Sequence, residues 1–370
     1  MSWPAVQLGD ICEFKYGKSL PKKIRTDGKV GVYGSNGCVG SHNEVLVEKE
    51  CIVIGRKGSF GEINMVDGPS WPIDTTYYID ASATTCNLNW LAYRLKCIGL
   101  KRLNKSAAVP GLNRNDAYRL ETLLPPLHEQ KRIAAILDKA DALRQKRKKA
   151  IELLDSLTQS IFLDMFYNSD TSGWATSSVA ELCSNIRTGP FGSQLLHSEF
   201  VDNGVAVLGI DNAVNNRFEW GKARHITAQK YQALSRYTVH PGDVLITIMG
   251  TCGRCAIVPP GVPLAINTKH LCCITLDQQK ILPEYLHASF LMHPEVLKQL
   301  GVRTKGAVMP GLNMGIIKSL KVPIPPIDRQ LTFKNIVQKN EANKRNAEAS
   351  VSSLDQLFGS LQRRAFAGEL

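Results

Sequence analysis

The sequence predicts an α+β chain that is built twice: two mostly-β globular domains joined by two long antiparallel coiled-coil helices, with an internal pseudo-twofold repeat. The motif Lys105-Ser-Ala-Ala-Val-Pro-Gly-Leu-Asn113 recurs 200 residues later as Lys305-Gly-Ala-Val-Met-Pro-Gly-Leu-Asn313. Between residues 105–166 and 305–366, 18 of 62 aligned positions are identical without a gap. Because solenoid repeats have periods of about 20–50 residues, so long a period indicates a duplicated domain.

The composition is that of a folded protein that could bind a polyanion. Hydrophobic residues make up 44% and charged residues 21% of the 370 residues, as in ordinary globular proteins. The formal net charge of +12 favours a nucleic-acid partner, although a merely basic protein fits the same number. The N-terminus has no secretory pattern, no stretch reaches the roughly 18 apolar residues of a membrane span, and the cysteines form no disulfide framework. We therefore expect a cytoplasmic protein.

Residues 1–124 predict the first globular domain. Short runs of β-branched residues alternate with glycine-containing turns such as Gly34-Ser-Asn-Gly37, which is typical of small β domains. A helix is expected near residues 88–101.

Residues 125–168 predict the first long helix. Pro125-Pro126 excludes a helix immediately upstream, because a residue before proline is pushed to extended backbone. The positions that follow show the three-four alternation of a coiled coil. The predicted seam positions are Ile136, Leu143, Leu154, Leu157 and Ile161.

Residues 169–324 predict a second globular domain that is loosely related to the first. Segment 50–61 aligns with 242–253, and both are short β-branched runs that end in glycine turns. Further helical structure is expected near residues 283–300. Between the shared segments the two copies differ freely, as expected of two domains that share a scaffold and recognise different targets.

Residues 325–370 predict the second long helix. Its seam repeats that of the first helix, at Ile336, Leu354, Leu357 and Leu361. A helix of about 37 residues would be roughly 55 Å long, and its seam would be exposed without a partner. The intervening segment permits a parallel or an antiparallel pair. We favour the antiparallel pair, because a twofold arrangement uses the same seam from both copies.

Catalytic and metal-binding signatures are weak. Tyr16-Gly-Lys-Ser19 resembles the end of a phosphate loop, but Cys12 stands where that motif requires glycine. Cys252 and Cys255, followed by Cys272-Cys273, have a spacing that could hold zinc. Their aligned positions in the first copy are apolar, however, so core cysteines are the better interpretation. The sequence thus predicts no catalytic residue, no metal and no cofactor.

DNA contacts require cationic, amide or hydroxyl side chains that reach the phosphates or a groove. In the first domain the candidates are Lys22, Lys23, Arg25, Arg56, Lys57 and Lys105. In the second domain they are Gln194, Arg217, Arg224, Thr251, Arg254, Lys269, His270 and Lys305. Ordinary solvated surface residues have the same character. Lys105 and Lys305 differ from the rest in that they recur in register.

The order of motifs resembles one protein family along the whole chain. A β domain, Pro-Gly-Leu-Asn, Pro-Pro-Leu-His-Glu-Gln-Lys-Arg-Ile and a long helix follow one another, and the series then repeats up to Arg364-Ala-Phe-Ala-Gly-Glu-Leu370. This order is similar to that of the specificity subunit of type I restriction-modification systems.

The resemblance implies two target recognition domains, each of which reads one half of an interrupted double-stranded DNA site. It also implies that the two helices set the spacing of the half-sites and dock methyltransferase subunits, two of them by symmetry. The subunit itself would perform no chemistry. Adenine methylation, ATP-driven translocation and cleavage would belong to the modification and restriction partners.

Two other hypotheses remain open at this point. One is a self-sufficient nuclease or methyltransferase on the same scaffold, which the absence of a methyl-donor loop or a carboxylate cluster in the sequence disfavours. The other is a coiled-coil scaffold that binds only protein.

Overall fold

The computed structural model describes residues 3–103, 111–171, 173–301 and 311–370. Lys105 and Lys305 lie outside these ranges. The chain divides into two compact units, one of residues 1–149 with 347–370 and the other of residues 150–346. In the described part of the chain, no helix is long and apolar enough to cross a membrane.

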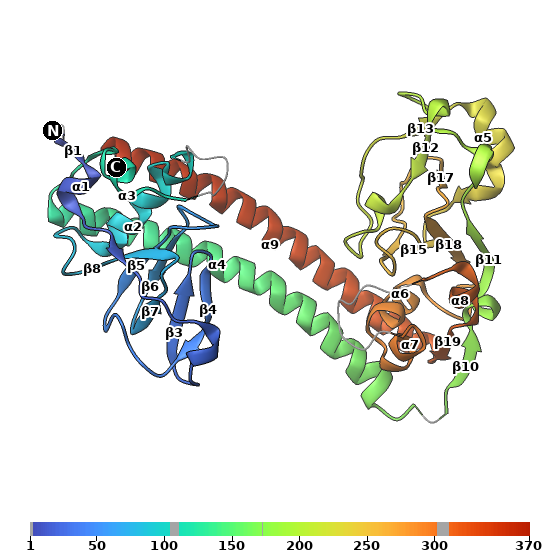
Figure 1. Cartoon of the computed structure of the whole chain (residues 1–370). Coiled ribbons are helices and arrows are strands. Elements are labelled where there is room, and N and C mark those ends of the chain that lie inside the picture. Colours follow the sequence, from blue (N-terminus) through green and yellow to red (C-terminus); the bar gives the residue numbers. More distant parts are fainter. Residues whose placement is uncertain (1–2, 104–110, 172, 302–310) are drawn as a thin grey trace. The chain divides into compact units, whose positions relative to one another are not determined.

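The first unit contains a four-stranded antiparallel sheet, a three-stranded sheet and a two-stranded sheet (Figure 1). Its strands are β1 (Ala5–Gln7), β2 (Lys15–Tyr16), β3 (Val30–Gly34), β4 (Gly37–His42), β5 (Cys51–Gly55), β6 (Ile63–Val66), β7 (Ser70–Pro72), β8 (Thr76–Asp80) and β9 (Glu121–Leu123). Its helices are α1 (Leu8–Ile11), α2 (Leu88–Cys97), α3 (Arg114–Tyr118) and one part each of the long helices α4 (Leu127–Leu163) and α9 (Ile327–Ala367).

The second unit contains the remaining parts of α4 and α9 and a larger set of strands. Its strands are β10 (Ala175–Ser178), β11 (Cys183–Thr188), β12 (Val205–Leu208), β13 (His225–Ile226), β14 (Thr238–Val239), β15 (Val244–Thr247), β16 (Cys255–Ile257), β17 (Ala265–Asn267), β18 (Leu271–Leu276) and β19 (Lys321–Ile324). Its other helices are α5 (Ala228–Leu234), α6 (Pro283–Met292), α7 (Pro294–Gln299) and α8 (Met314–Ser319).

The two units share one strand topology. The order β2-β8-β5-β6 in the first unit matches β11-β18-β15-β16 in the second. The three-stranded sheet of the first unit corresponds to the second four-stranded sheet, β13-β12-β17-β14, of the second unit. The parallel pair β3 and β7 matches the parallel pair β12 and β17, and the antiparallel neighbours β4 and β13 also match. The duplication predicted from the motifs is therefore also a duplication of fold.

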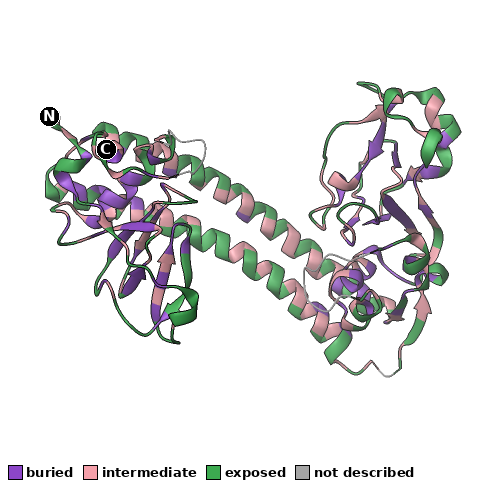
Figure 2. Cartoon of the chain, viewed as in Figure 1, coloured by how far each residue is buried: buried purple, intermediate pink, exposed green. Residues whose placement is uncertain are grey.

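Each unit has its own apolar core where the four-stranded sheet meets a helix (Figure 2). Trp90 on α2 is fully buried in the first core, and Tyr285 on α6 is fully buried in the second. The Leu of each Pro-Gly-Leu-Asn motif, Leu112 or Leu312, is also buried. The Asn that follows accepts a hydrogen bond from a backbone N–H in the first turn of α3 or α8, so both asparagines act as helix caps.

A buried glutamine ties each globular part to the start of a long helix. Gln130 Nε2 donates to the Pro125 carbonyl at 2.9 Å, and its Oε1 accepts the Asn87 backbone N–H at 2.8 Å. Gln330 repeats both bonds, to the Pro325 carbonyl at 2.9 Å and from the backbone N–H of Leu282 at 2.8 Å. Asn87 and Leu282 are the N-cap residues of α2 and α6. The same clamp therefore joins equivalent elements in both units.

Within each unit α4 and α9 run antiparallel, and the same ion pair occurs in both. Arg144 Nε lies 2.7 Å from Asp355 Oδ1 in the first unit. Lys344 Nζ lies 2.6 Å from Asp155 Oδ1 in the second. The partners correspond at the 200-residue offset of the repeat. The antiparallel arrangement thus uses equivalent positions of both helices, as the sequence predicted.

The predicted seam is correct in part. Six of its positions are half-buried, namely Ile136, Leu154, Ile161, Ile336, Leu354 and Leu361. The prediction is wrong for Leu143, Leu157 and Leu357, which are 54%, 47% and 51% exposed.

The seam lies one residue further along the helix at those three places. Arg144, Thr158 and Phe358 occupy it, and Phe358 is only 8% exposed, with the Arg144 guanidinium 4.4 Å above its ring. Thr158 accepts a hydrogen bond from Asn340 Nδ2 at 3.2 Å across the helix pair. The leucine pattern was misleading because the seam also accepts the ion-paired Arg144 side chain, the hydrogen-bonded Thr158 hydroxyl and the Phe358 ring in place of leucine.

We predict that Gln330→Ala destabilises the protein by about 2 kcal/mol or more. The substitution leaves the Leu282 N–H and the Pro325 carbonyl buried without partners. Gln338→Ala, at an exposed position of the same helix, is the matched control and should change stability little. Denaturant unfolding of both variants measures the difference. Equal stabilities would show that the clamp contributes nothing.

Candidate nucleic-acid interface

The first globular domain has an exposed tyrosine that is flanked by two arginines. Tyr16 is 51% exposed, with the Arg56 guanidinium 4.9 Å and the Arg114 guanidinium 5.2 Å from its ring centroid. Each guanidinium also donates to a backbone carbonyl, Arg56 to Asp74 and Arg114 to Phe14. In the described part of the chain neither arginine has a carboxylate partner. We call these three residues the Tyr16 cluster; its uncompensated positive charge suits a phosphate.

The other first-domain candidates lie apart from one another. Lys57 is exposed next to Arg56, and its backbone bridges to Gly111. Lys22 and Lys23 are exposed on a short 3-10 turn. Arg25 has a structural role, because its guanidinium donates to the carbonyls of Leu20 and Val39.

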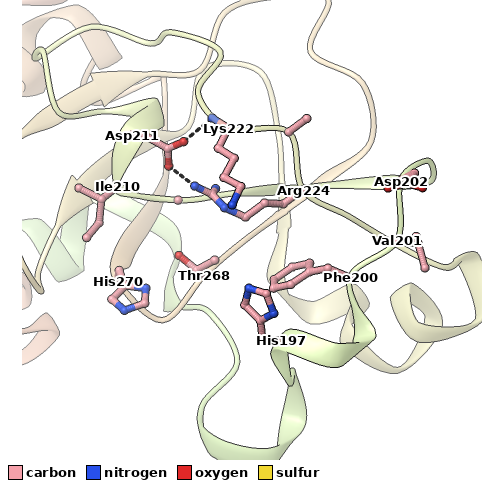
Figure 3. A pocket seen from close by; sticks show the side chains of 12 residues that line it. His197, Phe200, Val201, Asp202, Ile210, Asp211, Lys222, Arg224, Thr268 and His270 are labelled. Carbon is pink, nitrogen blue, oxygen red and sulfur yellow. Dashed lines mark hydrogen bonds and ion pairs between the residues drawn. The ribbon is translucent and has the colours of Figure 1, made fainter.

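The second globular domain contains a surface pocket of about 440 Å³ (Figure 3). Two predicted residues, Arg224 and His270, line it together. The other residues that line it are His197, Phe200, Val201, Asp202, Gly209, Ile210, Asp211, Lys222, Ala223 and Thr268. Lysine, arginine and histidine side chains thus share this pocket with two carboxylates.

Asp211 organises one side of the pocket. Its Oδ1 lies 2.5 Å from Arg224 Nη2, and its Oδ2 accepts the Lys222 backbone N–H at 2.6 Å. Burial alone would raise the pKa of Asp211, but the hydrogen bonds from Arg224 and Lys222 outweigh burial and hold that pKa below its usual value. The carboxylate therefore stays charged and keeps the guanidinium in place.

Thr268 and His270 form the opposite side. The Thr268 hydroxyl is buried and has no hydrogen-bond partner among the described residues. Burial, followed by the charges of Lys269 and Arg224, lowers the pKa of His270. A neutral His270 ring and an unpaired hydroxyl can each donate or accept a hydrogen bond.

A turn after β15 carries Thr251 and Arg254. Thr251 is exposed and Arg254 is half-buried. The Asn216 side chain accepts the Cys255 backbone N–H at 3.1 Å, and His287 Nε2 on α6 lies 2.9 Å from the Asn216 carbonyl. The half-buried His287, whose Nε2 also lies 3.0 Å from the Cys255 carbonyl, thereby links the end of this turn to the segment between β12 and β13.

The remaining second-domain candidates are scattered. Gln194 is exposed and accepts a hydrogen bond from the Tyr237 hydroxyl at 2.8 Å. Arg217 is ion-paired with Glu219. Lys269 is half-buried beside the pocket residue His270.

The cysteines with zinc-like spacing lie mainly in the core. Cys255, Cys272 and Cys273 are fully buried, and burial raises the pKa of all three thiols, that of Cys272 to about 12. Cys273 Sγ donates to Asp243 Oδ2 at 3.2 Å. Among the described residues no group of three or more His, Cys, Asp or Glu is placed to hold a metal ion.

The candidates predicted from the sequence include Arg56, Arg224 and His270 but not the residues that hold them in place. Tyr16 appeared only in a failed phosphate-loop match. Asp211 lies 13 residues from Arg224, and no local pattern links the two. The sequence did hold one usable signal, since Arg114 directly follows the Pro-Gly-Leu-Asn motif.

Comparison with known families gives a match in both halves of the chain. The family described as "Type I restriction modification DNA specificity domain" matches residues 2–153 and 171–347. These two segments cover most of the chain and repeat as the fold repeats.

Individual relatives agree with the family match. The chain is 23% identical over 362 residues to the type I restriction enzyme MjaVIII specificity subunit of Methanocaldococcus jannaschii, covering 89% of this chain and 83% of that protein. It is 24% identical over 279 residues to the EcoBI specificity subunit of Escherichia coli, covering 67% and 58%.

Two solved structures share the fold. One is the S subunit of a type I restriction-modification system from M. genitalium, with a TM-score of 0.67, 17% identity, and coverage of 99% of this chain and 96% of that one. The other comes from a study of complex assembly and conformational transition of the type I R-M system, with a TM-score of 0.57, 16% identity, and coverage of 100% and 98%.

We predict that the purified protein carries no equimolar zinc and that its buried thiols resist alkylation. The raised pKa values of Cys255, Cys272 and Cys273 disfavour the thiolate that both reactions require. The exposed Cys38 serves as the internal control and should be labelled in the native state. Elemental analysis and mass spectrometry of labelled peptides provide the readouts. One zinc per chain would contradict the assignment of these cysteines to the core.

Proposed function

Because the chain belongs to the type I restriction-modification DNA specificity family, we propose that its two globular domains read the two halves of an interrupted double-stranded DNA site. The chain is a DNA sequence-specificity subunit of a restriction-modification complex. We assign residues 1–124 and 169–324 to the two target recognition domains, and 125–168 and 325–370 to the spacer helices.

The observation that supports this proposal best is one scaffold used twice with different surfaces. Arg56 and Arg114 of the Tyr16 cluster align with Ile248 and Met314 of the second copy. In the second domain, the cationic side chains of Lys222 and Arg224 line the pocket instead. A shared fold with divergent surfaces is what two half-sites of different sequence require, since base contacts carry the specificity.

The long helices serve as spacer and docking surface in this proposal. The same ion pair joins the two helices in both units, and the same glutamine clamp joins a helix to a globular domain in both. Each domain is therefore attached to the helices in the same way. Leu143 and Leu357 in the first unit, and Leu153 and Leu157 in the second, leave apolar side chains exposed on the helices. Exposed apolar positions of this kind suit a protein partner. We assign them to methyltransferase subunits, one for each unit.

The chemistry belongs to the partners. The family supplies recognition, and the chain's own role is non-catalytic. Methylation of adenine would be carried out by the docked modification subunits, and ATP-dependent translocation and cleavage by restriction subunits recruited through the complex. We place the complex in the cytoplasm, where it would encounter chromosomal DNA and DNA that enters the cell.

We predict that the double variant Arg56→Ala, Arg114→Ala weakens DNA binding and reduces its dependence on salt. Loss of two phosphate contacts should lower the slope of log K against log salt by about 2. Lys101→Ala removes an exposed cation that is paired with Glu62 in the same domain, and serves as the control. Binding to target DNA of the assembled complex is measured over a range of salt concentrations. A slope equal to that of the wild type would exclude the cluster from the interface.

We also predict that Leu157→Ser weakens assembly with a co-expressed methyltransferase subunit, because the leucine is 47% exposed on the helix surface. Leu127→Ser removes an equally exposed leucine at the start of the same helix and should leave assembly unchanged. Size-exclusion chromatography of the co-expressed proteins measures the yield of complex. If both variants assemble like the wild type, the exposed leucines are not the docking surface.

A further inference from the structure

The ion pair between Arg224 and Asp211 is partly buried, and its surroundings leave space for it. The side chains are 23% and 33% exposed, and the nitrogen and oxygen lie 2.5 Å apart. Two glycines make room for the pair. A Cβ at Gly221 would lie 2.0 Å from Asp211 Oδ2, and a Cβ at Gly209 would lie 2.7 Å from Arg224 Nη1. Any larger residue at either place would displace the pair.

These residues lie on an insertion that only the second domain has. In the first domain, β3 ends at Gly34 and β4 begins at Gly37, so two residues connect the strands. The equivalent strands β12 and β13 end at Leu208 and begin at His225, with the segment 209–224 between them. Because the two copies diverge here, this segment can hold specificity that belongs to one half-site.

The donor pattern of Arg224 points to a base rather than a phosphate. An arginine has five N–H donors in a planar fork. Arg224 Nη2 donates to Asp211 Oδ1, and Nη1 donates to the Val207 carbonyl at 3.5 Å. A guanidinium held at two nitrogens keeps its remaining N–H donors in one orientation. Guanine presents two acceptors, O6 and N7, to a side chain in the major groove, and a planar arginine fork matches them with two hydrogen bonds. A phosphate can also accept two hydrogen bonds from an arginine, but it depends less on the orientation of the fork, since lysine binds it as a point charge.

The surroundings leave hydrogen-bonding capacity unused. The buried Thr268 hydroxyl has no partner in the described part of the chain, and His270 lines the same pocket (Figure 3). His270 can contact a neighbouring base, since an imidazole ring can donate or accept a hydrogen bond.

We propose that Arg224 reads a guanine in the half-site bound by the second domain, and that Asp211 is its positioning residue. This inference rests on the proposed function of the chain as a DNA-specificity subunit.

The test compares Arg224→Lys, Asp211→Asn and Lys280→Ala in the assembled complex. Each complex selects targets from a DNA library in which the second half-site is randomised and the first is kept. Arg224→Lys keeps the charge but loses the fork, and it should reduce the preference for guanine at one position by roughly 5- to 150-fold. Asp211→Asn should weaken the preference at the same position, with smaller effects elsewhere.

Lys280→Ala removes an exposed cation of the same domain outside the pocket, and it should keep the wild-type sequence preference. If Arg224→Lys retains full preference at every position, Arg224 does not read a base and the inference is overturned. A uniform loss of affinity without a change in preference overturns it too, because it identifies a phosphate contact. If the wild-type complex itself selects no interrupted site, the proposed function fails instead.

Discussion

The buried glutamine at the start of each long helix is the constraint on which the rest of the structure depends. Gln130 and Gln330 each accept the N–H of an N-cap residue in the globular part and donate to the first proline carbonyl before the long helix. Breaking such a buried hydrogen bond costs free energy, because the polar groups are left without a partner. Each globular part is therefore attached to its helix in a defined way, and the attachment is the same in both units.

This common attachment lets the exposed surfaces diverge. The strand order and the ion pair between the helices repeat, whereas the Tyr16 cluster and the Arg224 pocket have no counterpart among the described residues of the other copy. The features that repeat within the molecule thus attach the domains to the helices, and the features that differ are the candidate DNA-contacting surfaces. The proposed reading of two different half-sites by two domains of one chain requires both properties.

The sequence predicted the fold well where the signals were local. Pro125-Pro126 and Pro325-Pro326 correctly placed the helix starts, because proline restricts the backbone of its neighbour whatever the tertiary context. The seam was harder, since a three-four alternation can be drawn through Leu143 or through Arg144, and only the partner helix decides. The residues of the candidate nucleic-acid interface were the hardest to predict from the sequence. The Arg224–Asp211 pair and the stack of Arg56 on Tyr16 join residues distant in sequence, and no periodicity reports such contacts.

The central claim is that two related domains of one chain read two different halves of a single DNA site. Mapping of adenine methylation in genomic DNA from cells that express this chain with its modification subunit tests the claim most directly. We predict one motif made of two unlike specific halves separated by a gap of constant length. A contiguous motif, or a gap that varies between sites, would contradict the account.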